Sequence, residues 1–179
     1  MKKAILFFIL VISFSNIDSL AQNRSKSLYG ELLGASQGIG INYDARFRKG
    51  AADGFGWRAG AAFGYAYSTL SLFYDFKGDQ IQSYNQMFRF AAPLEVNYLA
   101  GKGKSKFESG VGAVLCLDRY TSESGAEPIH SFGVIPYFSL GYRLVTKNGF
   151  LFRIGALPSY HFSSSKVSIY PYLGFGKAF

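Results

Sequence analysis

Apolar and polar side chains alternate strictly over much of the chain. In residues 38–48 every second side chain, from Ile39 to Phe47, is apolar, and the others are glycine or polar. Residues 56–67 repeat this pattern with aromatic and alanine side chains on one parity. Successive residues of a β-strand point to opposite faces, so a period of two separates two environments. The chain therefore predicts strands with one apolar face.

The same alternation continues to the C-terminus and predicts further strands around residues 28–35, 88–98, 107–117, 132–144, 150–156 and 169–179. Short connections are expected at 49–55, 100–106 and 145–149, longer ones at 68–86, 118–131 and 157–168. A tight hairpin is expected around Ser36 and Gln37. Strands of about ten residues have the length that a tilted membrane crossing requires, and closure removes unpaired edges. We predict an all-β, eight-stranded antiparallel up-and-down transmembrane β-barrel.

The first 21 residues have the layout of a secretory signal peptide. Lys2 and Lys3 precede an apolar run from Ala4 to about Phe14, and the small residues Ser19 and Ala21 close the segment. A membrane-spanning helix needs roughly 20 apolar residues, which this run does not reach. We predict a signal peptide at 1–21, cleaved after Ala21, and a single barrel domain at 22–179.

Periodicity alone does not distinguish a membrane barrel from a soluble lipocalin-like barrel, which has its apolar face inside. Aromatic side chains on the apolar parity flank the short connections, as in the girdle of a membrane interface. This predicted aromatic girdle comprises Phe47, Trp57, Tyr98, Phe107, Tyr142, Phe150 and Phe179. Lys177 is the only charge on the apolar parity of the predicted strands, and its long side chain can reach the headgroups. These features favour a lipid-facing apolar surface.

Charged side chains of both signs occupy the opposite parity and are predicted to share a narrow interior. They are Glu31, Asp44, Arg46, Arg58, Arg89, Glu95, Glu108, Arg143 and Arg153. Many of their neighbours are glycine or alanine, which leaves room for long side chains. Charges buried together must pair, so we predict an interior salt-bridge network. A switchable gate or narrow pore is the alternative.

The sequence resembles the small eight-stranded outer-membrane barrels of the OmpA transmembrane domain and OmpX type, especially those common in Bacteroidetes. The segment Tyr170–Phe179 carries the closest match, since it is similar to the terminal strand, ending in phenylalanine, that the barrel-assembly machinery recognises. Lys177 departs from the aromatic or apolar residue usual at its position. The resemblance implies location in the cell outer membrane, the assembly machinery as a partner, and contact with outer-membrane lipid and lipopolysaccharide.

Candidate catalytic and metal-binding residues are few. His161 and Ser163 are similar to the pair in outer-membrane lipid A deacylases, but no Asp or Glu follows Glu127 to complete a triad. His130 and Cys116 are isolated, so no metal site is predicted. The chain is expected to be neither an enzyme nor a cofactor binder. Although the formal charge is +8, export argues against a nucleic-acid partner.

The outer connections are expected to carry the specificity of the protein. Residues 69–89 alternate around Lys77-Gly78-Asp79 and predict a hairpin above the membrane, whose edge is a candidate site for a protein partner. We therefore expect a structural, adhesive or surface-interaction role without a wide pore. The alternatives are a lipid-modifying enzyme similar to lipid A deacylases and a soluble periplasmic lipocalin-like barrel.

Overall fold

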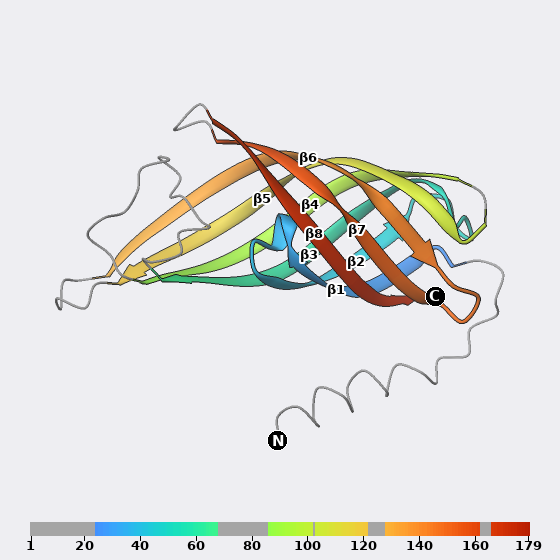
Figure 1. The fold of residues 1–179 in the computed structure, drawn as a ribbon, viewed down its shortest axis with the longest axis horizontal. Coiled ribbons are helices and arrows are strands. Elements are labelled where there is room, and N and C mark those ends of the chain that lie inside the picture. The colour runs from blue at the N-terminus through green and yellow to red at the C-terminus, as the bar shows by residue number, and fades with distance from the viewer. Residues whose placement is uncertain (1–23, 68–85, 102, 122–127, 162–165) are drawn as a thin grey trace, which may run out of the picture.

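The chain folds into a closed antiparallel barrel in which each strand pairs with its neighbours in sequence (Figure 1). The computed structural model describes residues 24–67, 86–101, 103–121, 128–161 and 166–179. Its strands are β1 (Lys26–Leu33), β2 (Ile39–Arg46), β3 (Gly54–Tyr67), β4 (Gln86–Ala100), β5 (Ser105–Thr121), β6 (Ile129–Val145), β7 (Phe150–His161) and β8 (Lys166–Ala178). The predicted eight-stranded up-and-down topology is confirmed. The predicted signal peptide lies outside the described residues.

Pairing of β1 with β8 closes the barrel and brings both ends of the described chain to one rim. Lys26 and Phe179 exchange backbone hydrogen bonds of 3.1 and 2.9 Å. The short connections 47–53, 101–104 and 146–149 lie at this same rim, which we call the turn end. The opposite rim, where β3 leads to β4, β5 to β6 and β7 to β8, is called the loop end.

Several strands extend further toward the loop end than the sequence predicted. Residues 118–121 and 129–131 belong to β5 and β6, and 157–161 and 166–168 belong to β7 and β8. In β5 the alternation continues, because Asp118 and Tyr120 are buried while Leu117 and Arg119 point outward. These segments are rich in polar residues and therefore resemble loops in composition. Their side chains nevertheless alternate between the inner and outer faces of the sheet.

The first strand was predicted to reach Ala35, but β1 ends at Leu33 and a 3-10 turn, η2 (Gly34–Ser36), follows. The predicted tight connection here is confirmed, but it folds into the barrel. Ala35, Ser36 and Gln37 are almost fully buried, and η2 contacts β8, β3, β1, β4 and β7. The β1–β2 connection therefore fills part of the barrel interior.

Gly34 allows this inward turn. Its φ is +54°, and a Cβ atom there would lie 2.5 Å from Cβ of Tyr172. We expect Gly34→Ala to lower the free energy of unfolding by about 1–3 kcal/mol, because backbone strain and overpacking add. Urea unfolding in detergent micelles, followed by Trp57 fluorescence, measures this loss.

Gly54 provides the matched control for that measurement. Its φ is +83°, but a Cβ atom there meets nothing within 4 Å. Gly54→Ala therefore carries the backbone strain without the contact, and its loss of stability should be the smaller of the two. Equal losses would contradict close packing of the turn against Tyr172.

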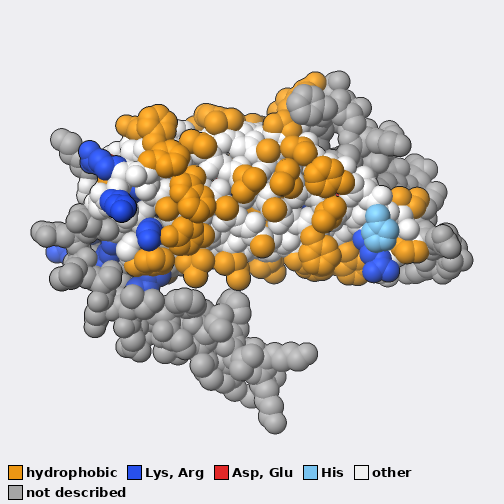
Figure 2. Space-filling view, turned by 180° about the vertical axis from the view of Figure 1, so that it is seen from behind, with side chains coloured by type: hydrophobic (Ala, Val, Ile, Leu, Met, Phe, Trp, Pro, Cys, Tyr) orange, Lys and Arg blue, Asp and Glu red, His pale blue; other side chains and the backbone are white. Residues whose placement is uncertain are grey.

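The outward face of the barrel is a broad apolar belt. Large apolar side chains from every strand are exposed on it, among them Ile41, Phe90, Val111, Phe138 and Ile169. Figure 2 shows apolar side chains spread around the barrel on the face in view, with Lys and Arg side chains near its two ends. Among the described residues, no helix is long and apolar enough to cross a membrane.

Candidate functional site: the charged barrel interior

The inward parity of the strands carries the nine charged side chains predicted for the interior. All are nearly inaccessible to solvent, at 6% exposure or less: Glu31, Asp44, Arg46, Arg58, Arg89, Glu95, Glu108, Arg143 and Arg153. They come from β1 to β7, so closure of the sheet is what brings them together. Glycines on the same parity make the space, because a Cβ atom at Gly56, Gly110 or Gly141 would overlap a neighbouring side chain.

Toward the turn end, Arg143 joins two of the buried carboxylates. Its guanidinium donates to both carboxylate oxygens of Asp44, at 3.1 and 3.0 Å, and to both oxygens of Glu108, at 2.9 Å each. Asp44 also accepts from Arg46 at 2.6 Å and from Asn97 at 2.7 Å. Bidentate arginine–carboxylate contacts of this kind are strong and fix orientation. Two strands on opposite sides of the barrel, β2 and β6, are thereby joined.

In the middle of the barrel, Arg153 continues the chain of contacts from Glu108 to Glu31. It donates to each of these carboxylates at 3.0 Å and lies over the rings of Tyr29 and Tyr172, 4.5 and 5.1 Å from their centroids. Arg58 donates to the same oxygen of Glu31 as Arg153, Oε2, at 2.9 Å, while Oε1 accepts from the Ser36 hydroxyl at 3.2 Å. Cations over aromatic faces are further stabilised by the ring quadrupole.

Arg58 ends this chain of contacts. It lies 3.2 Å from a carboxylate oxygen of Glu95 and donates to the hydroxyl of Tyr137 at 3.0 Å. Eight of the nine predicted residues thus form one connected set, which we call the interior charge network: Glu31, Asp44, Arg46, Arg58, Glu95, Glu108, Arg143 and Arg153.

Arg89 is separate from the interior charge network. Two nitrogen atoms of its guanidinium donate to the two carboxylate oxygens of Asp118. The hydroxyl of Tyr120 also donates to Asp118, at 3.2 Å. Arg89 also donates to the side-chain oxygen of Gln37, which the inward β1–β2 connection supplies. The sequence reasoning missed Asp118 because it ended the fifth strand at 117. The alternation of side chains continues to Tyr120, but the strand was recognised only from its pairing with β4 and β6.

Apolar side chains lie between Arg89 and the interior charge network. Val114, Cys116, Ile135 and Leu157 are at most 2% exposed and pack together with Ala35 of η2. The inward direction of Val114, Ile135 and Leu157 was not predicted. The interior is thus layered, with ion pairs toward both ends and an apolar layer between them, and it is filled by side chains as expected for so narrow a barrel.

The buried arginines and carboxylates are equal in number. The interior charge network holds four arginines and four carboxylates, and the Arg89–Asp118 pair adds one of each. Removing a charge from water costs several kcal/mol unless a partner offsets it. Each guanidinium here has at least one carboxylate partner, whereas the ammonium of Lys106, which is also buried, donates to the backbone carbonyl of Gly103 at 2.8 Å.

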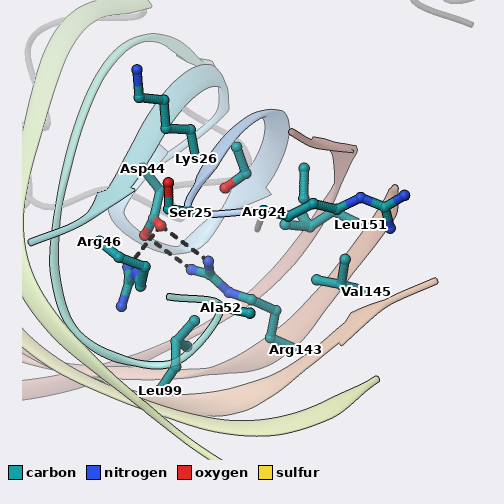
Figure 3. A pocket seen from close by; sticks show the side chains of 12 residues that line it. Arg24, Ser25, Lys26, Asp44, Arg46, Ala52, Leu99, Arg143, Val145 and Leu151 are labelled. Atoms are coloured by element: carbon teal, nitrogen blue, oxygen red, sulfur yellow. Dashed lines mark hydrogen bonds and ion pairs between the residues drawn. The ribbon is translucent and has the colours of Figure 1, made fainter. Parts of the chain in front are cut away.

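A small cavity remains at the turn end of the interior (Figure 3). It has a volume of about 20 Å³ and is lined in part by Ser27, Asp44, Arg46 and Arg143. A volume of this size admits about one water molecule. Figure 3 shows Arg143 reaching across to Asp44 beside it, so the contact between these two side chains narrows the interior here.

Six residues of the predicted aromatic girdle point outward and are exposed near the turn end: Phe47, Trp57, Tyr98, Phe107, Tyr142 and Phe150. Phe179 is partly exposed at the same rim. Phe55 belongs to the same belt and packs against Tyr98 with the two rings tilted, their centroids 4.8 Å apart. A second aromatic cluster, not predicted, lies nearer the loop end, where Phe63 and Tyr65 of β3 contact Phe88 of β4 at 6.1 and 5.0 Å.

The candidate catalytic residues are not assembled in the described part of the barrel. His130 lies exposed in β6, opposite Arg119 of β5. Its neighbour Ser131 points to the other face of the sheet, toward Asp118. The side chains of His161 and Ser163 lie outside the described residues. Within the described ranges, no three His, Cys, Asp or Glu side chains are placed to hold a metal ion.

The sheet is closed and antiparallel, its exterior is apolar with a rim of aromatic side chains, and its interior is charged. Together these features define one class of protein fold. The chain has the fold of the small eight-stranded outer-membrane β-barrels. No protein-family model matches the sequence, and no curated protein matches it.

Three solved structures illustrate the likeness. The N-terminal β-barrel domain of Pseudomonas aeruginosa OprF is 13% identical and has a TM-score of 0.51, with 88% of this chain and 100% of that one covered. Neisserial surface protein A is 12% identical, covers 84% and 91%, and has a TM-score of 0.47. Ail, the attachment invasion locus protein of Yersinia pestis, is 12% identical, covers 86% and 95%, and has a TM-score of 0.45. At these identities the likeness concerns the fold alone.

Proposed function

We propose that the protein is an outer-membrane barrel with a structural, adhesive or surface-interaction role, and that it is neither a wide pore nor an enzyme. The observation that carries the proposal is the reversed distribution of side chains: apolar groups are exposed around the barrel, while ion pairs fill its interior. A surface of this kind is stable in lipid and prone to association in water. The turn end then faces the periplasm and the loop end the exterior.

The two alternatives fit these observations less well. A soluble lipocalin-like barrel needs an apolar cavity inside and a polar exterior, whereas the interior here holds charged groups and packed apolar side chains. A lipid A deacylase needs a histidine close to a serine and a carboxylate. The candidate pair, His161 and Ser163, has no Asp or Glu after Glu127 to complete a triad, which favours a non-enzymatic role.

The partners follow from the proposed location. Outer-membrane lipid covers the apolar belt, lipopolysaccharide surrounds the loop end, and the barrel-assembly machinery recognises the C-terminal strand that ends at Phe179. The candidate protein-binding hairpin at 69–89 lies largely outside the described residues and stays a prediction, as does the likeness to Bacteroidetes barrels.

Cell fractionation tests the location. We expect the protein in the outer-membrane fraction, with an apparent size on gels that changes when the sample is boiled, because closed membrane barrels resist detergent unfolding until heated. Immunoblotting of fractions, with and without boiling, measures both properties. Recovery in the soluble fraction with heat-independent mobility would overturn the proposal.

A further inference from the structure

The exterior of the barrel carries a strong asymmetry of charge. Because the five buried arginines are matched by five buried carboxylates, the chain's formal charge of +8 is carried by its other charged residues. On the face seen in Figure 2, more Lys and Arg side chains lie at the turn end, on the left, than at the loop end, on the right. We call this set the basic rim: Arg24, Lys26, Arg48, Lys49, Lys104, Lys147 and Lys177.

The basic rim is accessible and has little opposing charge. Lys26, Arg48, Lys49, Lys104 and Lys147 are exposed, and Asp53 is the one acidic side chain in the described connections at this end. The loop end is close to neutral, because Arg119 and Lys166 at the ends of β5 and β8 are offset by acidic residues in the connecting segments. The connecting segments 68–85 and 122–127 contain Asp75, Asp79, Glu123 and Glu127, against Lys77 alone.

The basic rim adjoins the aromatic girdle, which fixes the kind of partner it meets. Arg48 and Lys49 lie in the turn that follows Phe47 and precedes Phe55, and both of these aromatic side chains are at least 60% exposed. Exposed aromatics of this kind sit at the level of lipid headgroups. Cations immediately beyond them are placed at the depth of headgroup phosphates, where anionic lipids attract Lys and Arg.

We propose that the basic rim binds the phosphate headgroups of anionic phospholipids in the leaflet that meets the turn end. This inference rests on the proposed membrane location and adds a lipid class to it. The rim would enrich lipids of net negative charge, such as phosphatidylglycerol, around the turn end. The surrounding leaflet thereby fixes the depth and orientation of the barrel.

Trp57, the only tryptophan of the chain, is a built-in reporter for this proposal. It is 39% exposed in the aromatic girdle, on β3, next to the turn that contains Arg48 and Lys49. The purified protein is reconstituted into phosphatidylcholine vesicles that contain either brominated phosphatidylglycerol or the same fraction of brominated phosphatidylcholine. Bromine on the acyl chains quenches the fluorescence of a nearby tryptophan. The quenching by brominated phosphatidylglycerol divided by the quenching by brominated phosphatidylcholine therefore reports which lipid is enriched around Trp57.

We expect a preference for phosphatidylglycerol of about two- to fivefold in relative association, as for exposed ion pairs. The double variant Arg48→Gln/Lys49→Gln should bring the ratio close to one. In 1 M salt the wild-type ratio should also fall, because the Debye length shrinks to about 3 Å.

The matched control is Arg119→Gln/Lys166→Gln, which removes the same charge at the opposite end of the barrel from Trp57. Arg119 lies near the loop end of β5, and Lys166 begins β8 at the same end, so neither residue belongs to the basic rim. This control should keep the preference. A wild-type ratio near one, or an equal loss in the control, overturns the proposal. If heat-dependent gel mobility persists in either case, the membrane location stands and only the lipid preference is refuted.

Discussion

Replacing Arg153 with methionine is expected to lower the free energy of unfolding by about 3–5 kcal/mol. Arg153 donates to both Glu31 and Glu108, and its side chain is fully buried. Its loss leaves the interior charge network with one carboxylate in excess, in a space closed to water. Urea unfolding of the barrel in detergent micelles, followed by Trp57 fluorescence, gives the free energy.

Two further variants separate charge balance from packing. Arg153→Met combined with Glu108→Gln restores neutrality, because Arg143 still pairs with Asp44, and it should recover part of the loss. Arg119→Met removes an exposed arginine and should change stability by less than about 0.5 kcal/mol. An Arg153→Met barrel as stable as the wild type would contradict a charge network that holds the strands together.

Introducing an arginine at Val111 is expected to destabilise the barrel in a bilayer by about 2–4 kcal/mol. Val111 lies near the middle of β5, points outward with 64% exposure, and has Val96 and Phe138 as register partners. A charge at this position must enter the hydrocarbon region. Equilibrium unfolding of the reconstituted barrel in phosphatidylcholine vesicles measures the cost.

Ser105→Arg provides the matched comparison. Ser105 begins the same strand at the turn end and is exposed, so an arginine there reaches the headgroups or water and should have little effect. If Val111→Arg proves as mild as Ser105→Arg, the apolar belt does not face hydrocarbon. This comparison therefore distinguishes a lipid-facing surface from a water-facing one within a single strand.

The face on which each side chain lies could be predicted from the sequence wherever alternation was unbroken. Glu31, Asp44 and Glu108 were assigned inward because successive residues of a strand must point to opposite sides. Strand ends were less predictable. The segment after Leu117 has the composition of a loop, and only its pairing with β4 and β6 shows that Asp118 continues the strand.

By itself, the sequence determined the class of the fold, its closure and the two faces of the sheet. The alternation of side chains within a strand is local, so it assigns each residue to a face whichever strands pair. The tertiary structure alone decided which charges pair. Arg153 contacts Glu31, 122 positions away, because barrel closure brings β7 and β1 to the same depth. It also decided that Gly34–Ser36 turns inward, since that depends on the space left by small side chains of other strands. Local patterns specify the environment of a residue, whereas partners across a closed barrel depend on the register of all its strands.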